Sequence, residues 1–219
     1  LHLQLAHTGH FYRYEAYLVA MGLVASGEGL AGLRLHLPRS LRDVRGLCLA
    51  TGACLGMAML ALRAASGLLL TVPATGNIYR QQVQMGLFLA EYYQGAAVAA
   101  NDVGAINYLA DLRCLDIVGL GSREVSEARA RGTYTSDLLG QWATEEDVRI
   151  ALAYDWYLRE GDAGLTGAPD TWVLVARWSI ESVFAPEQDT ITLYAVGEEP
   201  ARLLANVREF SERLPAGVR

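Results

Sequence analysis

The stretch AAVAANDVGAINYLADLRCLDIVGL, residues 96–120, decides the fold class. AAVAA at 96–100 is a short apolar run typical of a buried strand, and NDVG at 101–104 is rich in turn-forming residues. AINYLA then continues as a short helix, and a second strand follows at 113–120. Two buried strands joined by a helix predict a parallel βαβ unit with a right-handed crossover.

The chain on the carboxyl side extends this pattern. Periodicity and turn signals predict further helices at 123–131 and 135–146, and further strands at 148–155, 172–178 and 190–196. Pro200 opens a last helix. Residues 73–219 are therefore expected to form an α/β domain with a mainly parallel sheet plus an antiparallel strand pair, preceded by a helix at 74–93.

Upstream lie two apolar runs. Residues 46–62, GLCLATGACLGMAMLAL, carry no charge, and residues 16–33 are apolar apart from Glu28 and a few small polar residues. Each run approaches the length needed to cross a hydrocarbon layer of about 30 Å. We therefore predict two transmembrane helices in a membrane region, residues 1–72. A buried helical hairpin of a soluble protein is the alternative.

The loop between these runs, residues 34–45, holds four Arg against one Asp. Short Arg-rich loops mark the cytoplasmic side of a membrane. We therefore expect a protein of the bacterial inner membrane whose α/β domain lies on the outer side.

Charge divides the chain in the same way. Residues 1–71 carry six Arg against three acidic residues, whereas residues 72–219 carry twelve Arg against twenty-one. An acidic domain disfavours nucleic acid as a partner, because phosphates require a basic face. Cys48, Cys54 and Cys114 have no metal-binding spacing, so no metal site is predicted.

Three carboxylates, Asp102, Asp116 and Asp155, lie in or just after the three predicted parallel strands. The crevice at the carboxyl ends of such strands is the usual ligand site of open α/β sheets. The three are thus candidates for binding a sugar or a cation. The alternative is that they cap turns and bind nearby backbone.

Other motifs exclude common chemistries. Gly119 and Gly121 follow a strand, but Glu124 occupies the place of the third glycine in a dinucleotide fingerprint. All four His lie within residues 1–36, which excludes a Ser-His or Cys-His hydrolase inside the α/β domain. No catalytic residue and no cofactor can be assigned from the sequence.

The densest polar and aromatic cluster is HTGHFYRYEAYL, residues 7–18, before the first apolar run. Arg13 and Glu15 there are candidates for contact with an anionic lipid head group and a sugar. The tyrosines of this cluster are equally typical of the aromatic belt at a membrane interface.

Four segments together resemble the C-terminal region of bacterial C-type membrane glycosyltransferases of the protein O-mannosyltransferase-like superfamily. They are GHFYRYEAYL (9–18), NIYRQQVQMGLFLAEYY (77–93), NDVGAINYLADLRCLDIVGL (101–120) and TITLYAV (190–196). The match follows the same order over most of the chain, and its most specific part is NDVGAINYL followed by LDIVGL.

The resemblance implies an enzyme that transfers a sugar from a polyprenyl-phosphate donor at the outer membrane face. It implies that Arg13 and Glu15 contact the donor, and that the α/β domain is accessory or faces the acceptor. The catalytic acidic residue of such enzymes lies in an early external loop. We therefore expect a piece of such an enzyme that lacks N-terminal membrane helices. A non-enzymatic, membrane-tethered binding or assembly domain remains the alternative.

Overall fold

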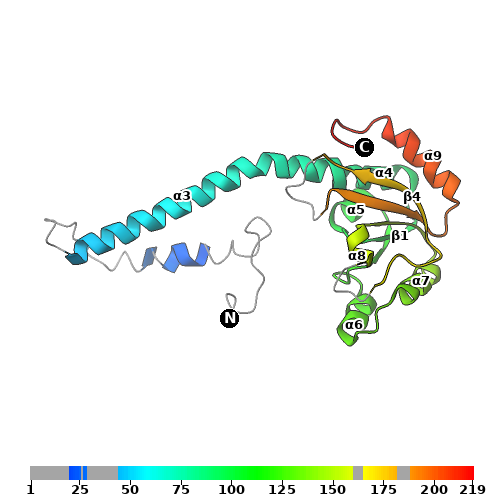
Figure 1. The fold of residues 1–219 in the computed structure, drawn as a ribbon, viewed down its shortest axis with the longest axis horizontal. Helices are drawn as coiled ribbons and strands as arrows, with labels where there is room; N and C mark the ends of the chain where they lie inside the picture. The colour runs from blue at the N-terminus through cyan, green and yellow to red at the C-terminus, as the bar shows by residue number, and fades with distance from the viewer. Residues whose placement is uncertain (1–19, 26, 29–43, 160–164, 182–187) are drawn as a thin grey trace. The chain divides into compact units, whose positions relative to one another are not determined.

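A computed structural model describes residues 20–25, 27–28, 44–159, 165–181 and 188–219 (Figure 1). The chain divides into two compact units, Leu1–Pro73 and Ala74–Arg219. Each unit is described by itself.

The long helix α3, Val44–Ile78, contains the predicted span at 46–62 and continues past Arg63 and Pro73. Proline removes one backbone donor, but its φ is compatible with a helix, and here it does not end one. The separate helix predicted to begin after Pro73 is therefore a continuation of α3. Because α3 begins at Val44, the last two residues of the predicted loop at 34–45 are helical.

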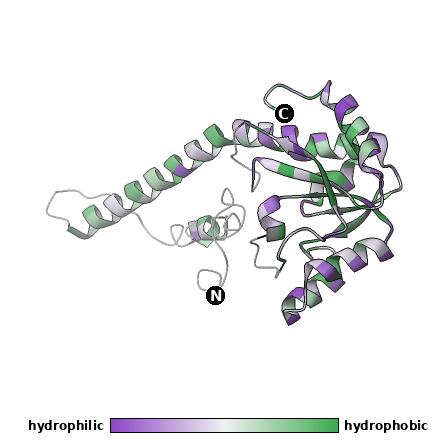
Figure 2. Cartoon of the chain, turned by 45° about the vertical axis from the view of Figure 1, so that its right-hand side comes forward, coloured by the Kyte–Doolittle hydropathy of each residue, from purple (hydrophilic) through white to green (hydrophobic). Residues whose placement is uncertain are grey.

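Most apolar side chains of α3 are exposed in the part of the chain that the structure describes. Leu55, Met57, Leu62, Leu68 and Val72 all keep more than three-fifths of their surface exposed. Figure 2 shows apolar residues along the length of α3. A helix that is apolar all round requires apolar surroundings, and among the described residues one helical stretch, Gly46–Tyr92, is long and apolar enough to cross a membrane.

Two spans are predicted from the sequence, but the described residues contain only this one candidate. Of the predicted first span, residues 20–25 and 27–28 are described and helical. The rest of that span lies outside the described residues. So do residues 34–43 of the predicted loop, and so do Arg13 and Glu15.

The second unit is a mixed α/β fold, which confirms the predicted class. Its five-stranded open sheet has the order β2-β1-β3-β5-β4. The strands are β1 (Ala97–Ala100), β2 (Arg113–Asp116), β3 (Val148–Ala153), β4 (Val173–Ser179) and β5 (Thr190–Ala195). β1 pairs in parallel with β2 and β3, while β5 runs antiparallel to both β3 and β4.

Helices cover both faces of this sheet. They are α4 (Gln84–Tyr92), α5 (Gly104–Leu109), α6 (Arg123–Arg131), α7 (Ser136–Glu145), α8 (Asp155–Arg159) and α9 (Pro200–Ser211). Figure 1 shows α4 and α9 on one side of the unit, and α6 and α7 on the other. Phe88 of α4 lies at ring distances of 6.5 Å from Trp178 of β4 and 5.5 Å from Phe210 of α9, so an aromatic cluster joins three elements.

The outer edge of β4 carries a short added segment. Ser179 and Arg219 exchange two backbone hydrogen bonds, of 2.7 and 2.9 Å. Ile180 forms a β-bridge with Val218, and Glu181 N–H donates to the Gly217 carbonyl. The chain after α9 therefore returns to cover the end of an edge strand.

Candidate functional site

The three candidate carboxylates lie at the carboxyl ends of the three parallel strands. Asp116 is the last residue of β2, Asp102 follows β1 by two residues, and Asp155 opens α8 directly after β3. In the sheet register Ala100 pairs with both Asp116 and Leu152, so these strand ends are adjacent. Each carboxylate nevertheless has its own set of partners.

Asp116 organises the loop that follows it. Its Oδ1 accepts backbone hydrogen bonds from Val118 (2.9 Å) and Gly119 (3.2 Å), and its Oδ2 accepts one from Gly121. Its own N–H donates to Ser122 Oγ. Only 3% of Asp116 is exposed, so this carboxylate is used by local backbone and is closed to a ligand. This is the alternative considered for the residue from sequence.

Asp102 belongs to a buried polar network. Gln82 Nε2 donates to Asp102 Oδ2 at 2.8 Å, and the Tyr154 hydroxyl donates to Gln81 Oε1 at 3.1 Å. Gln81 and Gln82 are both at least 96% buried. Both lie in η1, a π-helical turn spanning Tyr79–Val83. Such turns are rare and often mark functional positions.

The sheet crevice between β1 and β3 is filled by the chain itself. The void beside Asp102, bounded also by Met85 and Asn101, is too narrow to hold a water molecule. Gln82 Oε1 is buried there without a hydrogen-bond partner among the described residues. At the place where open α/β sheets usually bind a ligand, the Asp102 carboxylate is thus already bound by Gln82 of the π-turn.

Asp155 lies in a more open position, with a third of its side chain exposed. Thr192 Oγ1 and the Tyr194 hydroxyl, both from β5, donate to Asp155 Oδ1 at 2.6 and 3.2 Å. The Arg177 guanidinium of β4 lies 3.5 Å from Oδ2. Asp155 therefore links α8 to the antiparallel strand pair.

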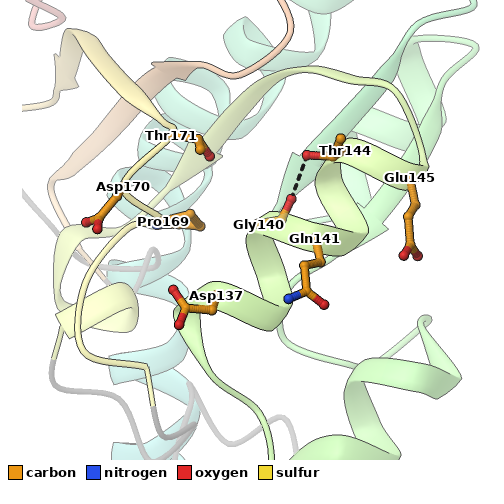
Figure 3. Close-up of a pocket in the computed structure, with 8 residues that line it drawn as sticks. All are labelled: Asp137, Gly140, Gln141, Thr144, Glu145, Pro169, Asp170 and Thr171. Atoms are coloured by element: carbon orange, nitrogen blue, oxygen red, sulfur yellow. Dashed lines mark hydrogen bonds between the residues drawn. The ribbon is translucent and has the colours of Figure 1, made fainter.

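A separate depression of about 520 Å³ lies between α7 and the segment before β4 (Figure 3). Asp137, Glu145 and Asp170 give it an acidic lining. Gly140 allows the close approach of the two walls, because a Cβ there would lie 3.1 Å from Pro169 Cβ. No group of His, Cys, Asp or Glu suited to a metal ion occurs within the described ranges.

Burial also controls the ionisable groups near the strand ends. Tyr134 donates its hydroxyl to the Ile117 carbonyl at 3.0 Å, and burial raises the pKa of this phenol. Burial likewise raises the pKa of the Cys114 thiol to about 11. Both groups stay protonated at neutral pH, so neither is a nucleophile or a base there.

Sequence reasoning missed Gln81, Gln82 and Tyr154. Polar residues in an amphipathic helix are normally expected on its solvent-exposed face, and nothing in the local sequence predicts a π-turn. The predicted strand at 148–155 contains Tyr154, but the sequence does not indicate that its hydroxyl binds Gln81. The only signal was indirect: two adjacent glutamines in a segment that carries the family resemblance.

Residues 76–194, more than half of the chain, match a family model described as a domain of unknown function, DUF8728. This match covers η1, α4, all three parallel strands and the antiparallel pair through Tyr194. No curated protein and no solved structure matches the chain.

Proposed function

We propose that this chain, which belongs to the DUF8728 family, is part of a bacterial integral-membrane glycosyltransferase that uses a polyprenyl-phosphate sugar donor. In this proposal the α/β unit is an accessory domain that faces the acceptor on the outer side of the inner membrane. The observation that carries the proposal is α3, a helix with exposed apolar side chains all round that leads into the α/β unit. A lipid-linked donor lies in the membrane, and an apolar helix such as α3 would hold the chain beside it.

The resemblance of sequence supplies the chemistry of this proposal. Three of its four segments, 77–93, 101–120 and 190–196, lie in the second unit. Gln82 of the first donates to Asp102 of the next. This contact supports treating these two segments as one family trait.

The accessory role follows from how the edge carboxylates are used. Sugar transfer requires a base within about 2.6–3.2 Å of the acceptor hydroxyl. It also requires a cation or a basic pair at the leaving phosphate. Asp116 is buried and Asp102 lies beside a void that has no room for an acceptor, and both accept hydrogen bonds within their own chain. Asp155 is more open, but its carboxylate is held by Thr192, Tyr194 and Arg177. We therefore propose that catalysis takes place outside the α/β unit.

Donor binding is the direct test. A photoreactive polyprenyl-phosphate sugar would be irradiated with the full chain in lipid nanodiscs. We expect labelling within residues 1–72, reduced by Arg13→Ala and Glu15→Gln and unchanged by Arg208→Ala, which changes an exposed residue of α9. Labelling that does not respond to Arg13 or Glu15 would contradict the proposed donor contacts.

Activity and topology complete the test. We expect no sugar transfer by this chain alone. Transfer that is lost in Asp102→Asn would show a complete active site in the α/β unit and overturn the accessory role. An alkaline-phosphatase fusion at residue 150 should be active and one at residue 40 inactive, and the reverse would overturn the orientation.

A non-enzymatic, membrane-tethered binding domain is the second candidate. The acidic depression at α7 favours it, because about 520 Å³ of open volume there is lined by the carboxylates of Asp137, Glu145 and Asp170. Donor labelling separates the two candidates, since a tethered binding domain does not bind the lipid-linked sugar.

A further inference from the structure

A loop at the carboxyl edge of the parallel strands holds one leucine out into solvent. This edge loop, residues 117–121, follows β2, and Leu120 at its tip is 82% exposed. Glycines flank it on both sides, and Gly119 adopts φ +86°, a conformation that favours glycine. An exposed leucine on a mobile loop would be unremarkable, but this loop is firmly held.

Five hydrogen bonds from three side chains fix the edge loop around Leu120. The Asp116 carboxylate accepts from three of its backbone N–H groups, and the Tyr134 hydroxyl donates to the Ile117 carbonyl. The Arg129 guanidinium donates to the Val118 carbonyl. The buried carboxylate of Asp116 and the buried phenol of Tyr134 thus fix the backbone that holds Leu120 in an exposed position.

The same edge is where the chain enters the second unit. Gln82 in η1 donates to Asp102 beyond the end of β1, and Ala100 of β1 pairs with Asp116 of β2. The last residue of α3 and the first residue of η1 are exposed as well: Ile78 by 37% and Tyr79 by 51%. Tyrosine and aliphatic side chains at a chain entry from an apolar helix are typical of a membrane interface.

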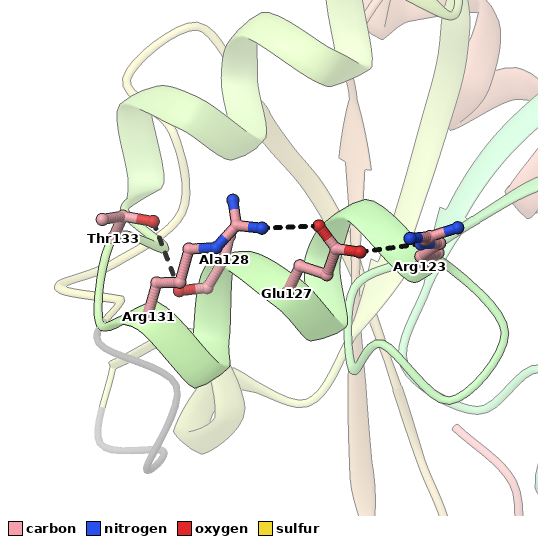
Figure 4. Close-up of polar contacts among 5 residues, drawn as sticks. All are labelled: Arg123, Glu127, Ala128, Arg131 and Thr133. Atoms are coloured by element: carbon pink, nitrogen blue, oxygen red, sulfur yellow. Dashed lines mark hydrogen bonds and ion pairs between the residues drawn. The ribbon is translucent and has the colours of Figure 1, made fainter.

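A cation follows the leucine. The Arg123 side chain, at the start of α6, is 85% exposed. It pairs with Glu127 at 2.7 Å, but Glu127 also pairs with Arg131 at 2.8 Å (Figure 4). One carboxylate therefore serves two guanidinium groups, and exposed pairs of this kind are weak. Arg123 is available to an anionic head group.

We infer that the edge loop is an interfacial contact, with Leu120 inserted among lipid head groups and Arg123 beside their phosphates. This inference rests on the proposed membrane tether and adds a second contact between the α/β unit and the lipid surface. The contact would limit the orientations of the tethered unit. Its occupant is a lipid surface, and a second copy or a protein partner would be a different outcome.

Lipid-quenching fluorescence on the full chain tests the inference. An environment-sensitive probe would be attached to Leu120→Cys in a Cys48→Ala, Cys54→Ala background. The buried thiol of Cys114 stays in place, and the background chain without an added cysteine measures its labelling. Matched probes would be placed at Leu60→Cys in α3 and at Glu145→Cys, which lies beside the amino-terminal end of β3.

Nanodiscs with nitroxide groups near the head groups would serve as the lipid quencher, and iodide as the quencher in water. We expect probes at 60 and 120 to lose about half their fluorescence or more to the nitroxide lipids, because interfacial side chains reach roughly 5–10 Å into the layer. The probe at 145 should respond to iodide alone. Arg123→Ala should weaken quenching at 120, more in anionic than in neutral lipid.

Each other result is decisive against the inference. If the nitroxide lipids quench the probe at 60 while the probe at 120 is accessible to iodide, the membrane tether is supported and the interfacial contact is overturned. A probe at 120 protected from both quenchers would indicate a protein contact instead. Equal lipid quenching at 120 and 145 would show that the unit has no preferred edge. Loss of quenching at 60 would overturn the membrane tether together with the contact.

Discussion

Helix α3 and helix α4 have similar apolar content but opposite surroundings. Leu62 of α3 is 70% exposed, whereas Phe88 of α4 is fully buried among the aromatic rings of β4 and α9. In α4 most apolar side chains are buried, although Leu87 stays 41% exposed. In α3 most of the described apolar side chains are exposed. The comparison shows that burial, and not composition, separates a core helix from a helix whose apolar side chains lie open.

Removing an apolar side chain from each helix should give the largest contrast. Phe88→Ala is expected to lower the free energy of unfolding of the α/β unit by about 3–5 kcal/mol, because it leaves a cavity in the aromatic cluster. Leu62→Ala should change it by less than about 0.5 kcal/mol. All four tryptophans lie in the α/β unit, so urea unfolding followed by tryptophan fluorescence measures that unit within the full chain. Equal effects would refute the comparison.

Adding a charge to α3 tests the proposal that this helix lies in lipid. Leu62→Asp places a carboxylate in α3 at a cost of about 2.5–3.5 kcal/mol for membrane insertion. We expect a larger fraction of the chain to be released from membranes by carbonate, with unchanged tryptophan fluorescence. Tyr108→Asp is the matched control, since Tyr108 is 88% exposed on α5. Similar release of both variants would mean that α3 does not hold the chain in lipid.

A buried polar contact should matter less than the aromatic cluster. Tyr134→Phe removes the hydroxyl that donates to the Ile117 carbonyl, and should destabilise the α/β unit by about 1–2 kcal/mol at neutral pH.

This effect should also depend on pH. Burial raises the folded-state pKa of Tyr134, so its contribution is complete below the ordinary tyrosine value of about 10 and is lost as the pH rises above it. The difference between the two chains should therefore narrow above pH 10. A constant difference in chemical unfolding between pH 8 and 11 would contradict this.

The smallest effect is expected at a helix end. Thr135 caps α7 by accepting from Leu138 N–H at 3.2 Å, so Thr135→Ala should cost about 1 kcal/mol. Thr144→Ala removes only an exposed bond to the Gly140 carbonyl within the same helix, and should cost less. Urea unfolding that ranks Thr144 above Thr135 would show that the cap is not formed.

The regular parts of the α/β unit were predictable from sequence. The buried strands β1, β3 and β5 are apolar runs bounded by turn-forming residues, and α6 occupies the predicted residues 123–131. The second strand was predicted to reach residue 120 but ends at Asp116. The reason is the Asp116 carboxylate, which takes backbone donors that a continuing strand would offer to its neighbours. Helix α8 was missed, because its five residues are too few for a periodic signal.

The candidate site was predictable only in outline. The βαβ pattern predicts parallel strands, whose carboxyl ends meet at one edge, and this is why Asp102, Asp116 and Asp155 could be expected there. The partners of Asp102 and Asp155 could not be expected, because Gln82 comes from a π-turn and Thr192 from a strand far along the chain. Whether a carboxylate is open or already occupied depends on such distant partners.

The segment that returns to β4 has a consequence for the chain during its synthesis and assembly. Strand edges offer unpaired backbone groups that can template aggregation. At one edge of this sheet β2 is only four residues long, and at the other the end of β4 is paired with residues 217–219. Residues 217–219 follow α9, so this second protection forms late. Until it forms, the α/β unit carries an open, partly apolar strand, and this is the interval in which a chaperone would be of most use to it.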